Sequence, residues 1–256
     1  STNYIDDTLL VAQNIDECKM NILDTVDFSE KAGFVIHPDK SVLHPTQCIQ
    51  YLGFNLDSQK MTVKLTAEKA KKLKEKCKKL IGKKEITIKE LSQTVGMMVA
   101  SFPGVTFGKL FYRNCDNHKT EALKENFGDY QAKTKLPNKC KEDLQWWAEN
   151  IELVEHRIRL NEPSVFLESD SSKLGWGGCM LTEGRKELTG GNWTGDESQL
   201  HINILELMAA WFTIQCFCSD ITDTHIQIKS DNTTTVSYIN NQGGTKSACN
   251  KIAQQI

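Results

Sequence analysis

The spacing of apolar residues predicts a first helix over residues 15–32. Its buried stripe would consist of four apolar residues, Ile22, Leu23, Val26 and Phe28. Asn14 or Asp16 is suited to cap the start of this helix, and Gly33 is suited to end it.

Two strands are predicted after this helix, a short one over residues 34–36 and a second over 48–56. The run Tyr51-Leu52-Gly53-Phe54 lies in the second predicted strand. A glycine within a strand often marks a bulge or a close approach of another backbone, and here that backbone could belong to a ligand strand.

The most basic helix is predicted over residues 66–84, with Thr66 as its cap. One face is apolar and consists of Ala70, Leu73, Cys77 and Leu80. The other faces carry seven lysines, Lys69, Lys71, Lys72, Lys74, Lys76, Lys78 and Lys79. Such a helix suits a phosphate backbone, because each neutralised phosphate releases counterions. A solvated helix face is the alternative interpretation.

Thr87 and Glu90 have capping-box spacing at the start of another predicted helix, which the run Phe102-Pro103-Gly104 ends. The apolar stripe of this helix would be Leu91, Val95, Met98 and Val99. Gly96 would allow close approach either of a nucleic-acid backbone or of a second helix.

Residues 108–135 show little apolar periodicity, whereas 137–151 predict a helix and 152–163 a linker. Trp146 and Trp147 lie in that helix. They are suited either to stack on bases or to serve as a core or interdomain anchor.

Three acids stand out in the last third of the chain. Strands are predicted over 165–170, 176–181 and 187–193, followed by an amphipathic helix over 199–217, a strand over 226–231 and a helix over 232–241. Asp170 and Asp231 end strands, and Glu206 lies in the middle of the first helix. This order would bring three carboxylates to one end of a mixed sheet. Phosphodiester hydrolysis with two Mg²⁺ ions needs such a cluster of oxygen ligands.

The composition is ordinary for a soluble globular protein, with a net charge of −2 over 256 residues. No apolar stretch approaches the roughly 18 residues of a membrane span, and no secretory signal opens the chain. The nine cysteines include no Cys-x-x-Cys pair, which disfavours a zinc ribbon. We expect reduced thiols and an intracellular location, in the cytoplasm or the nucleus.

The run Tyr4-Ile5-Asp6-Asp7 precedes five residues that are mostly apolar, 8–12. Neighbouring side chains of a strand point to opposite faces. Asp6 and Asp7 can therefore share one metal site only if a turn interrupts the strand. An acidic surface turn without a metal is the alternative.

This part of the chain resembles the second half of the palm of a retroelement reverse transcriptase. The resemblance rests on the acidic run, the helix after it, Pro38-Asp39-Lys40 and Tyr51-Leu52-Gly53-Phe54. The resemblance implies that Asp6 and Asp7 bind catalytic Mg²⁺, with Mn²⁺ as an option, and that Lys40 is a general acid for the leaving pyrophosphate. A solvated loop lysine is the alternative for Lys40. The two helices between 66 and 101 resemble a polymerase thumb. The residues expected to contact nucleic acid are Tyr4, Tyr51, Leu52, Gly53, Lys71, Lys72, Lys76, Lys79 and Gly96.

The order of Asp170, Glu206 and Asp231 resembles that of a ribonuclease H domain, which implies that these acids are catalytic and bind metal. Further runs resemble the polymerase–ribonuclease H region of DIRS-type retrotransposons, namely Trp146-Trp147, 203–207, 230–234, 238–240 and 243–245. Such elements use a tyrosine recombinase for DNA integration, and no such domain is visible here. The implied activity is RNA-directed DNA polymerase with ribonuclease H. The implied partners are an RNA template, a DNA primer, an RNA–DNA hybrid and deoxynucleoside triphosphates.

We therefore expect an α+β multidomain fold with four parts. These would be the C-terminal part of a palm with the primer grip (1–61), a thumb (62–118), a connection (119–162) and an α/β ribonuclease H-like domain with a mixed sheet (163–256).

The chain also departs from the family pattern, which includes an upstream palm Asp, a fingers region and a fourth ribonuclease H acid after a His. We expect a segment of a longer polyprotein, inactive in polymerisation and weak or inactive in hydrolysis by itself. A non-catalytic nucleic-acid-binding protein derived from such an element is the alternative. A caulimovirus-like or hepadnavirus-like polymerase is a third idea, against which the run from Ser230 to Thr245 argues.

Overall fold

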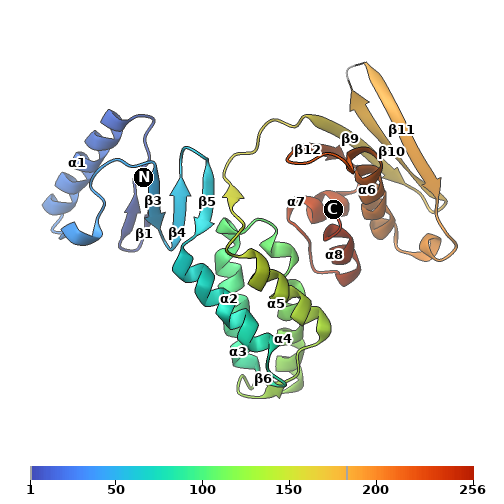
Figure 1. Cartoon of the computed structure of the whole chain (residues 1–256), viewed down its shortest axis with the longest axis horizontal. Coiled ribbons are helices and arrows are strands. Elements are labelled where there is room, and N and C mark those ends of the chain that lie inside the picture. The colour runs from blue at the N-terminus through green and yellow to red at the C-terminus, as the bar shows by residue number, and fades with distance from the viewer. Residues whose placement is uncertain (1, 183) are drawn as a thin grey trace.

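The N-terminal part combines a small hairpin, one helix and an antiparallel sheet. The computed structural model describes residues 2–182 and 184–256, and its elements follow one another from blue to red in Figure 1. The first elements are β1 (Thr2–Tyr4), β2 (Asp7–Leu9), α1 (Ile15–Lys31), the 3-10 helix η1 (Pro38–Lys40), β3 (Cys48–Tyr51), β4 (Phe54–Asp57) and β5 (Thr62–Leu65). β1 pairs with β2, and β4 lies between β3 and β5.

Helix α1 begins and ends as predicted, but its predicted stripe is not buried. The Asn14 side chain accepts a hydrogen bond from the Glu17 amide, and Gly33 follows the helix with a φ of 85°. Leu23 and Phe28 are exposed, and no residue of the helix is buried. The prediction of a buried stripe is wrong, because apolar spacing identifies a helix but burial requires a second layer over that face.

Two strand predictions in this part are also wrong. Residues 34–36 form no strand, because they pair with no neighbour in any sheet of the described chain. The single strand predicted over 48–56 is a hairpin of β3 and β4. Leu52 and Gly53 have φ of 51° and 78°, as in the two-residue turns that match the twist of paired strands.

The central part is helical. Its elements are α2 (Ala67–Ile81), β6 (Ile86–Thr87), α3 (Ile88–Ser101), the 3-10 helices η2 (Phe102–Gly104) and η3 (Gly108–Leu110), α4 (Arg113–Glu125), β7 (Lys133–Thr134), α5 (Asn138–Asn150) and β8 (His156–Arg157). β8 lies in the predicted linker and pairs with β5, which extends the N-terminal sheet to the order β3-β4-β5-β8. α4 was not predicted from the sequence.

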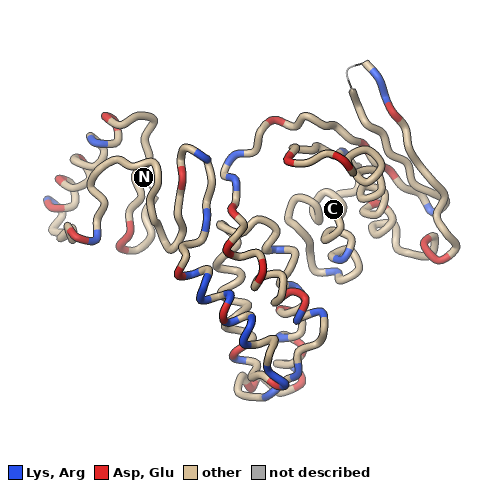
Figure 2. The backbone as a smooth tube through the Cα atoms, viewed as in Figure 1, with Lys and Arg blue, Asp and Glu red and all other residues tan. Residues whose placement is uncertain are grey.

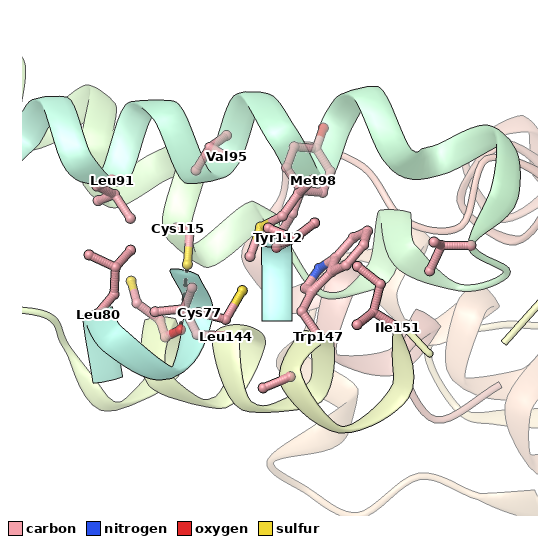
Figure 3. Packing of buried hydrophobic residues seen from close by; sticks show 14 of the residues in the cluster. Cys77, Leu80, Leu91, Val95, Met98, Tyr112, Cys115, Leu144, Trp147 and Ile151 are labelled. Carbon is pink, nitrogen blue, oxygen red and sulfur yellow. Dashed lines mark hydrogen bonds between the residues drawn. The ribbon is translucent and has the colours of Figure 1, made fainter. Parts of the chain in front are cut away.

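The core of the helical part lies between α2, α3, α4 and α5 (Figure 3). Trp147 is fully buried there, and its indole N–H donates to the carbonyl oxygen of Phe111 at 2.9 Å. The Trp146 ring stacks on the Phe111 ring with centroids 4.3 Å apart. This packing favours the interpretation of the two tryptophans as core anchors.

Local sequence signals describe this part well. The four residues of the predicted α2 stripe are all buried, and the Thr66 side chain caps the helix. Thr87 and Glu90 form both hydrogen bonds of the capping box. In α3, Leu91, Val95 and Met98 are buried as predicted, whereas Val99 is 44% exposed and does not belong to the buried stripe.

The C-terminal part is a mixed sheet around a central helix. Its elements are β9 (Val165–Ser171), β10 (Gly175–Thr182), β11 (Arg185–Asn192), the 3-10 helix η4 (Glu197–Gln199), α6 (Ile202–Cys218), β12 (Ile226–Lys229), α7 (Thr233–Asn240) and α8 (Ser247–Ala253). The sheet order is β11-β10-β9-β12, with β12 parallel to β9 and the other pairs antiparallel. The predicted mixed sheet is therefore present.

Helix α6 is covered on most sides. Six consecutive residues, 205–210, are buried. An amphipathic helix would expose one face along this stretch, so the prediction of amphipathicity is wrong. The helix packs on β9 and β10 on one side and on α7 and α8 on the other, which explains the burial of consecutive residues.

The C-terminal part contacts the helical part through a small apolar cluster. Leu110 of η3 packs with Leu207, Tyr238, Cys249 and Ala253. Gln254 donates a hydrogen bond to the carbonyl oxygen of Leu110 at 2.7 Å. The predicted α+β multidomain fold class is confirmed. None of the helices in residues 2–182 and 184–256 has the length and apolar character needed to cross a membrane.

Candidate metal centre

Three acids meet at one edge of the C-terminal sheet. Asp170 lies near the end of β9, and Asp231 comes two residues after β12. Because β9 and β12 run parallel as neighbours, their carboxyl ends reach the same edge. Helix α6 packs on β9 and brings Glu206 to this edge from the layer above.

The three carboxylates are close enough to share a cation. One oxygen from each of Asp170, Glu206 and Asp231 lies within 4.8 Å of the others. Glu206 is 5% exposed, whereas Asp170 and Asp231 are exposed. The cluster therefore has one buried carboxylate and two carboxylates that face solvent.

No ion pair among the described residues neutralises the buried Glu206 carboxylate. Its Oε2 atom is buried and accepts no hydrogen bond from the described residues. Burial, followed by the charges of Asp170 and Asp231, raises the pKa of Glu206 to about 7. A buried, unpaired acid beside two others is costly unless a cation neutralises it. An all-carboxylate set also suits a hard divalent cation such as Mg²⁺.

Two asparagines that were not singled out as site residues hold the elements around this cluster. Asn232 directly follows Asp231, and its side chain accepts a hydrogen bond from the Thr235 amide at the start of α7. The Asn232 amide group donates to the side chain of Asn203 in α6, and Asn203 donates to Thr234, both at 3.1 Å. Asn203 lies three residues before Glu206, so it shares a helix face with that acid. This spacing places it beside the acid, whereas its bonds to Asn232 and Thr234 depend on the approach of α7.

The second pair of candidate acids, Asp6 and Asp7, lies in the β1–β2 hairpin. Ile5 and Asp6 form its turn, in which Ile5 has a φ of 52°, and Asp7 is the first residue of β2. A turn therefore does interrupt the strand, which sharing a metal requires. Across the described part of the chain, no third Asp, Glu, His or Cys joins the pair in a cluster.

Tyr51, Leu52 and Gly53, which are expected to contact nucleic acid, lie against this hairpin and helix α2. The Tyr51 hydroxyl lies 3.4 Å from the carbonyl oxygens of both Thr2 and Asp7. Lys69 of α2 donates to the carbonyl oxygen of Leu52 at 2.7 Å. A side chain at Gly53 would meet the end of the Lys69 side chain, so a lysine of the same chain closely approaches this glycine.

The remaining predicted nucleic-acid contacts are spread over exposed surfaces. Tyr4 is exposed in β1, and Lys40 is exposed at the end of η1. Lysines mark the length of α2 in Figure 2, where Lys71, Lys72 and Lys79 are exposed. Lys76 is half-buried and donates to Gln93.

Gly96 is exposed on α3. A side chain added there would meet no atom of the described chain within 4 Å. The interpretation of Gly96 as a helix-packing residue is therefore wrong, and a close approach of an external molecule remains the alternative.

No protein-family model and no curated protein matches the sequence. Among solved structures, the chain is similar to a foamy viral protease–reverse transcriptase in complex with an RNA/DNA hybrid, at 14% identity over 95% of this chain and 32% of that one, with a TM-score of 0.45. A second similar structure is the dRH form of the foamy viral protein with double-stranded DNA, at 14% identity over 95% and 41% of the two chains, with a TM-score of 0.43. A third, also with double-stranded DNA, has 15% identity over 85% and 44% and a TM-score of 0.40. The chain thus spans less than half the length of each of these proteins.

Proposed function

We propose that this chain belongs to an RNA-directed DNA polymerase with ribonuclease H activity, and that Asp170, Glu206 and Asp231 form the hydrolytic centre. The observation that carries the proposal is the carboxylate cluster, in which the buried Glu206 has an unpartnered oxygen. The structural reason for retaining such an acid inside a helix layer is a bound cation.

The three acids would hold Mg²⁺, or Mn²⁺ in its place. When bound, such cations polarise a phosphodiester and lower the pKa of an attacking water. Glu206 is fixed within α6 and serves as the inner ligand, while the exposed Asp170 and Asp231 leave the outer side open to a nucleic-acid strand. Asn203 and Asn232 keep α6 and α7 in register around the cluster. The substrate would be the RNA strand of an RNA–DNA hybrid.

The polymerase half of the proposal concerns the N-terminal part. Asp6 and Asp7 would hold the metal for nucleotide addition, and Lys40 would protonate the leaving pyrophosphate. The β3–β4 turn at Leu52 and Gly53, with Tyr4 and Tyr51, would guide the primer. The partners would be an RNA template, a DNA primer and deoxynucleoside triphosphates.

The exposed lysines of α2 and the open surface at Gly96 would receive the phosphate backbone of the duplex. We assign residues 1–61, 62–118, 119–162 and 163–256 to palm, thumb, connection and ribonuclease H-like parts. The parent element would be a retrotransposon of the DIRS type.

A second candidate is a nucleic-acid-binding protein without catalysis. The observation in its favour is that Asp6 and Asp7 have no third ligand in the described part of the chain, while the lysine face of α2 is exposed. Such a protein would bind nucleic acid in a salt-dependent manner and would not require the C-terminal acids.

Calorimetric titration of Mn²⁺ into the purified chain distinguishes the two candidates. The proposal of a hydrolytic centre predicts that Mn²⁺ binds, and that Glu206→Gln and Asp231→Asn each weaken this binding at least about tenfold. Glu121→Gln is the matched control, because Glu121 is an exposed helical acid outside the cluster. Equal binding by all variants would contradict the metal centre.

Activity is tested in the longer chain, with an RNA–DNA hybrid as substrate. Glu206→Gln should abolish Mg²⁺-dependent cleavage of the RNA strand, while Glu121→Gln should retain it. Full function of the element with Glu206→Gln would favour the non-catalytic candidate.

A further inference from the structure

A polar cleft of about 240 Å³ lies where α4, α5 and α8 meet. We name it the junction cleft, and six of its lining residues carry the argument, Arg113, Lys139, Glu142, Thr245, Ser247 and Lys251. None of these residues belongs to the carboxylate cluster, which lies on β9, α6 and after β12. The junction cleft is therefore a separate feature of the molecule.

The charge of the junction cleft is positive. Three cationic side chains, Arg113, Lys139 and Lys251, face a single acid, Glu142. None of the three cations forms an ion pair with a residue in the described ranges. Like charges placed together repel one another, so this arrangement favours an anion in the cleft.

Arg113 contributes a restrained positive charge to the cleft. Its Nε atom is buried and donates to no acceptor in the described chain. The guanidinium group lies over the Tyr112 ring, with its central carbon 4.9 Å from the ring centroid, and this stacking restrains the plane of the group. This stacking holds the group at the wall of the cleft, so its permanent charge adds to those of Lys139 and Lys251.

The walls of the cleft are fixed by hydrogen bonds from both parts of the molecule. On the helical side, Asp143 accepts from the amide and from the side chain of Asn114, at 3.0 and 2.9 Å. On the other side, Asn250 accepts from the Gly244 amide at 2.9 Å. The cleft is thus formed before a ligand binds, which lowers the entropic cost of binding.

We propose that the junction cleft binds a phosphate-class oxyanion. A guanidinium group and two ammonium groups suit the negatively charged phosphate group and its tetrahedrally arranged oxygens. The hydroxyl groups of Thr245 and Ser247 add neutral donors. Clefts for drug-sized ligands typically have volumes of about 300–1,000 Å³. The junction cleft is smaller, which favours a small anion. The phosphate can be free, as phosphate or pyrophosphate, or part of a nucleic-acid backbone. The proposal does not depend on the activity assigned to the carboxylate cluster.

The test measures binding of phosphate, of pyrophosphate and of a single-stranded oligonucleotide to the intact chain by calorimetry, at matched ionic strength in chloride. The double variant Lys139→Gln/Lys251→Gln removes two exposed charges from the cleft and leaves buried packing untouched. Lys124→Gln is the control, because Lys124 is an exposed lysine of α4 that does not line the cleft.

A free anion is the ligand if phosphate or pyrophosphate binds and the double variant weakens this binding at least about tenfold, while the control does not. A backbone phosphate is the ligand if only the oligonucleotide binds and shows the same dependence on the two lysines. The proposal is overturned if none of the three probes binds, or if the double variant and the control bind them equally.

Discussion

Replacing Glu206 with Gln should stabilise the metal-free protein while removing its response to divalent cations. The carboxylate of Glu206 is buried and lies within 4.8 Å of two other acids. Gln keeps the size of the side chain and removes the charge. Its amide group can also donate to Asp170 or Asp231, which the carboxylate cannot do when ionised.

The magnitude follows from the geometry in two ways. At about 4.8 Å and the dielectric constant of water, each of the two repulsions involving Glu206 amounts to about 1 kcal/mol. The pKa of Glu206 is raised from 4.5 to about 7, mainly by burial, which corresponds to about 3 kcal/mol. Glu206→Gln should therefore raise the free energy of unfolding by about 2–3 kcal/mol at pH 8. This corresponds to a melting temperature higher by roughly 5–10 °C.

The pH dependence has a definite sign. Between pH 4.5 and 7 the folded state keeps a proton on Glu206 that the unfolded state has released, so the free energy of unfolding falls as the pH rises. The advantage of Glu206→Gln should be present at pH 8 and absent at pH 4.

The assay is thermal unfolding followed by circular dichroism, at pH 4 and pH 8, first in EDTA and then with increasing Mg²⁺. At a concentration 100-fold above its dissociation constant, a bound cation stabilises the parent by about 2.7 kcal/mol. Glu206→Gln should lose this stabilisation by Mg²⁺, and Glu121→Gln should behave as the unmodified chain. The reasoning is refuted if Glu206→Gln is less stable than the parent at pH 8 in EDTA, or if Mg²⁺ stabilises both equally.

Three further predictions concern other parts of the chain. Burial raises the pKa of Asp143 to about 6, so the free energy of unfolding of the unmodified chain should fall by up to about 3 kcal/mol as the pH rises from 4 to 7. Asp143→Asn should remove this fall in urea unfolding, and an unchanged pH profile would contradict the prediction. Trp147→Ala should destabilise the helical part by about 3–5 kcal/mol in the same measurement, because the ring fills the core and its N–H is paired; a loss below about 1 kcal/mol would show that the core collapses around the gap. Replacing Lys71, Lys72 and Lys79 with Gln should make the fall of log affinity for a nucleic-acid duplex with log salt concentration less steep, by up to about 2.7 in slope. A slope equal to that of the unmodified chain would exclude α2 from the interface.

The sequence predicted best what depends on short-range spacing. The α2 stripe is buried as predicted because four residues at helical spacing define one face, and α3 and α5 cover that face. The proximity of Asp170 and Asp231 was predicted because parallel neighbouring strands bring their ends to one edge. Glu206 was predicted to join them because it lies in the middle of the helix between these two strands.

The errors concern interactions between residues far apart in the sequence. β8 was assigned to a linker because its pairing of His156 with Val63 leaves no local pattern. α4 was missed because its buried residues, Cys115 and Ala122, are small and widely spaced. The roles of Asn203 and Asn232 depend on the approach of α6 to α7, which no single helix reveals.

The exposure of the N-terminal part has a consequence for how the molecule folds. No residue from 2 to 61 is buried, so this segment has no interior of its own. Beyond backbone pairing, Phe54 packs against the helical core and the Tyr51 hydroxyl lies near the β1–β2 hairpin. Small isolated hairpins are marginal in water. The nucleus of folding must therefore form after Thr62, where α2, α3 and α5 bring Leu73, Leu91 and Leu144 together. The β1–β2 hairpin that carries Asp6 and Asp7 should be the last to gain structure and the first to lose it.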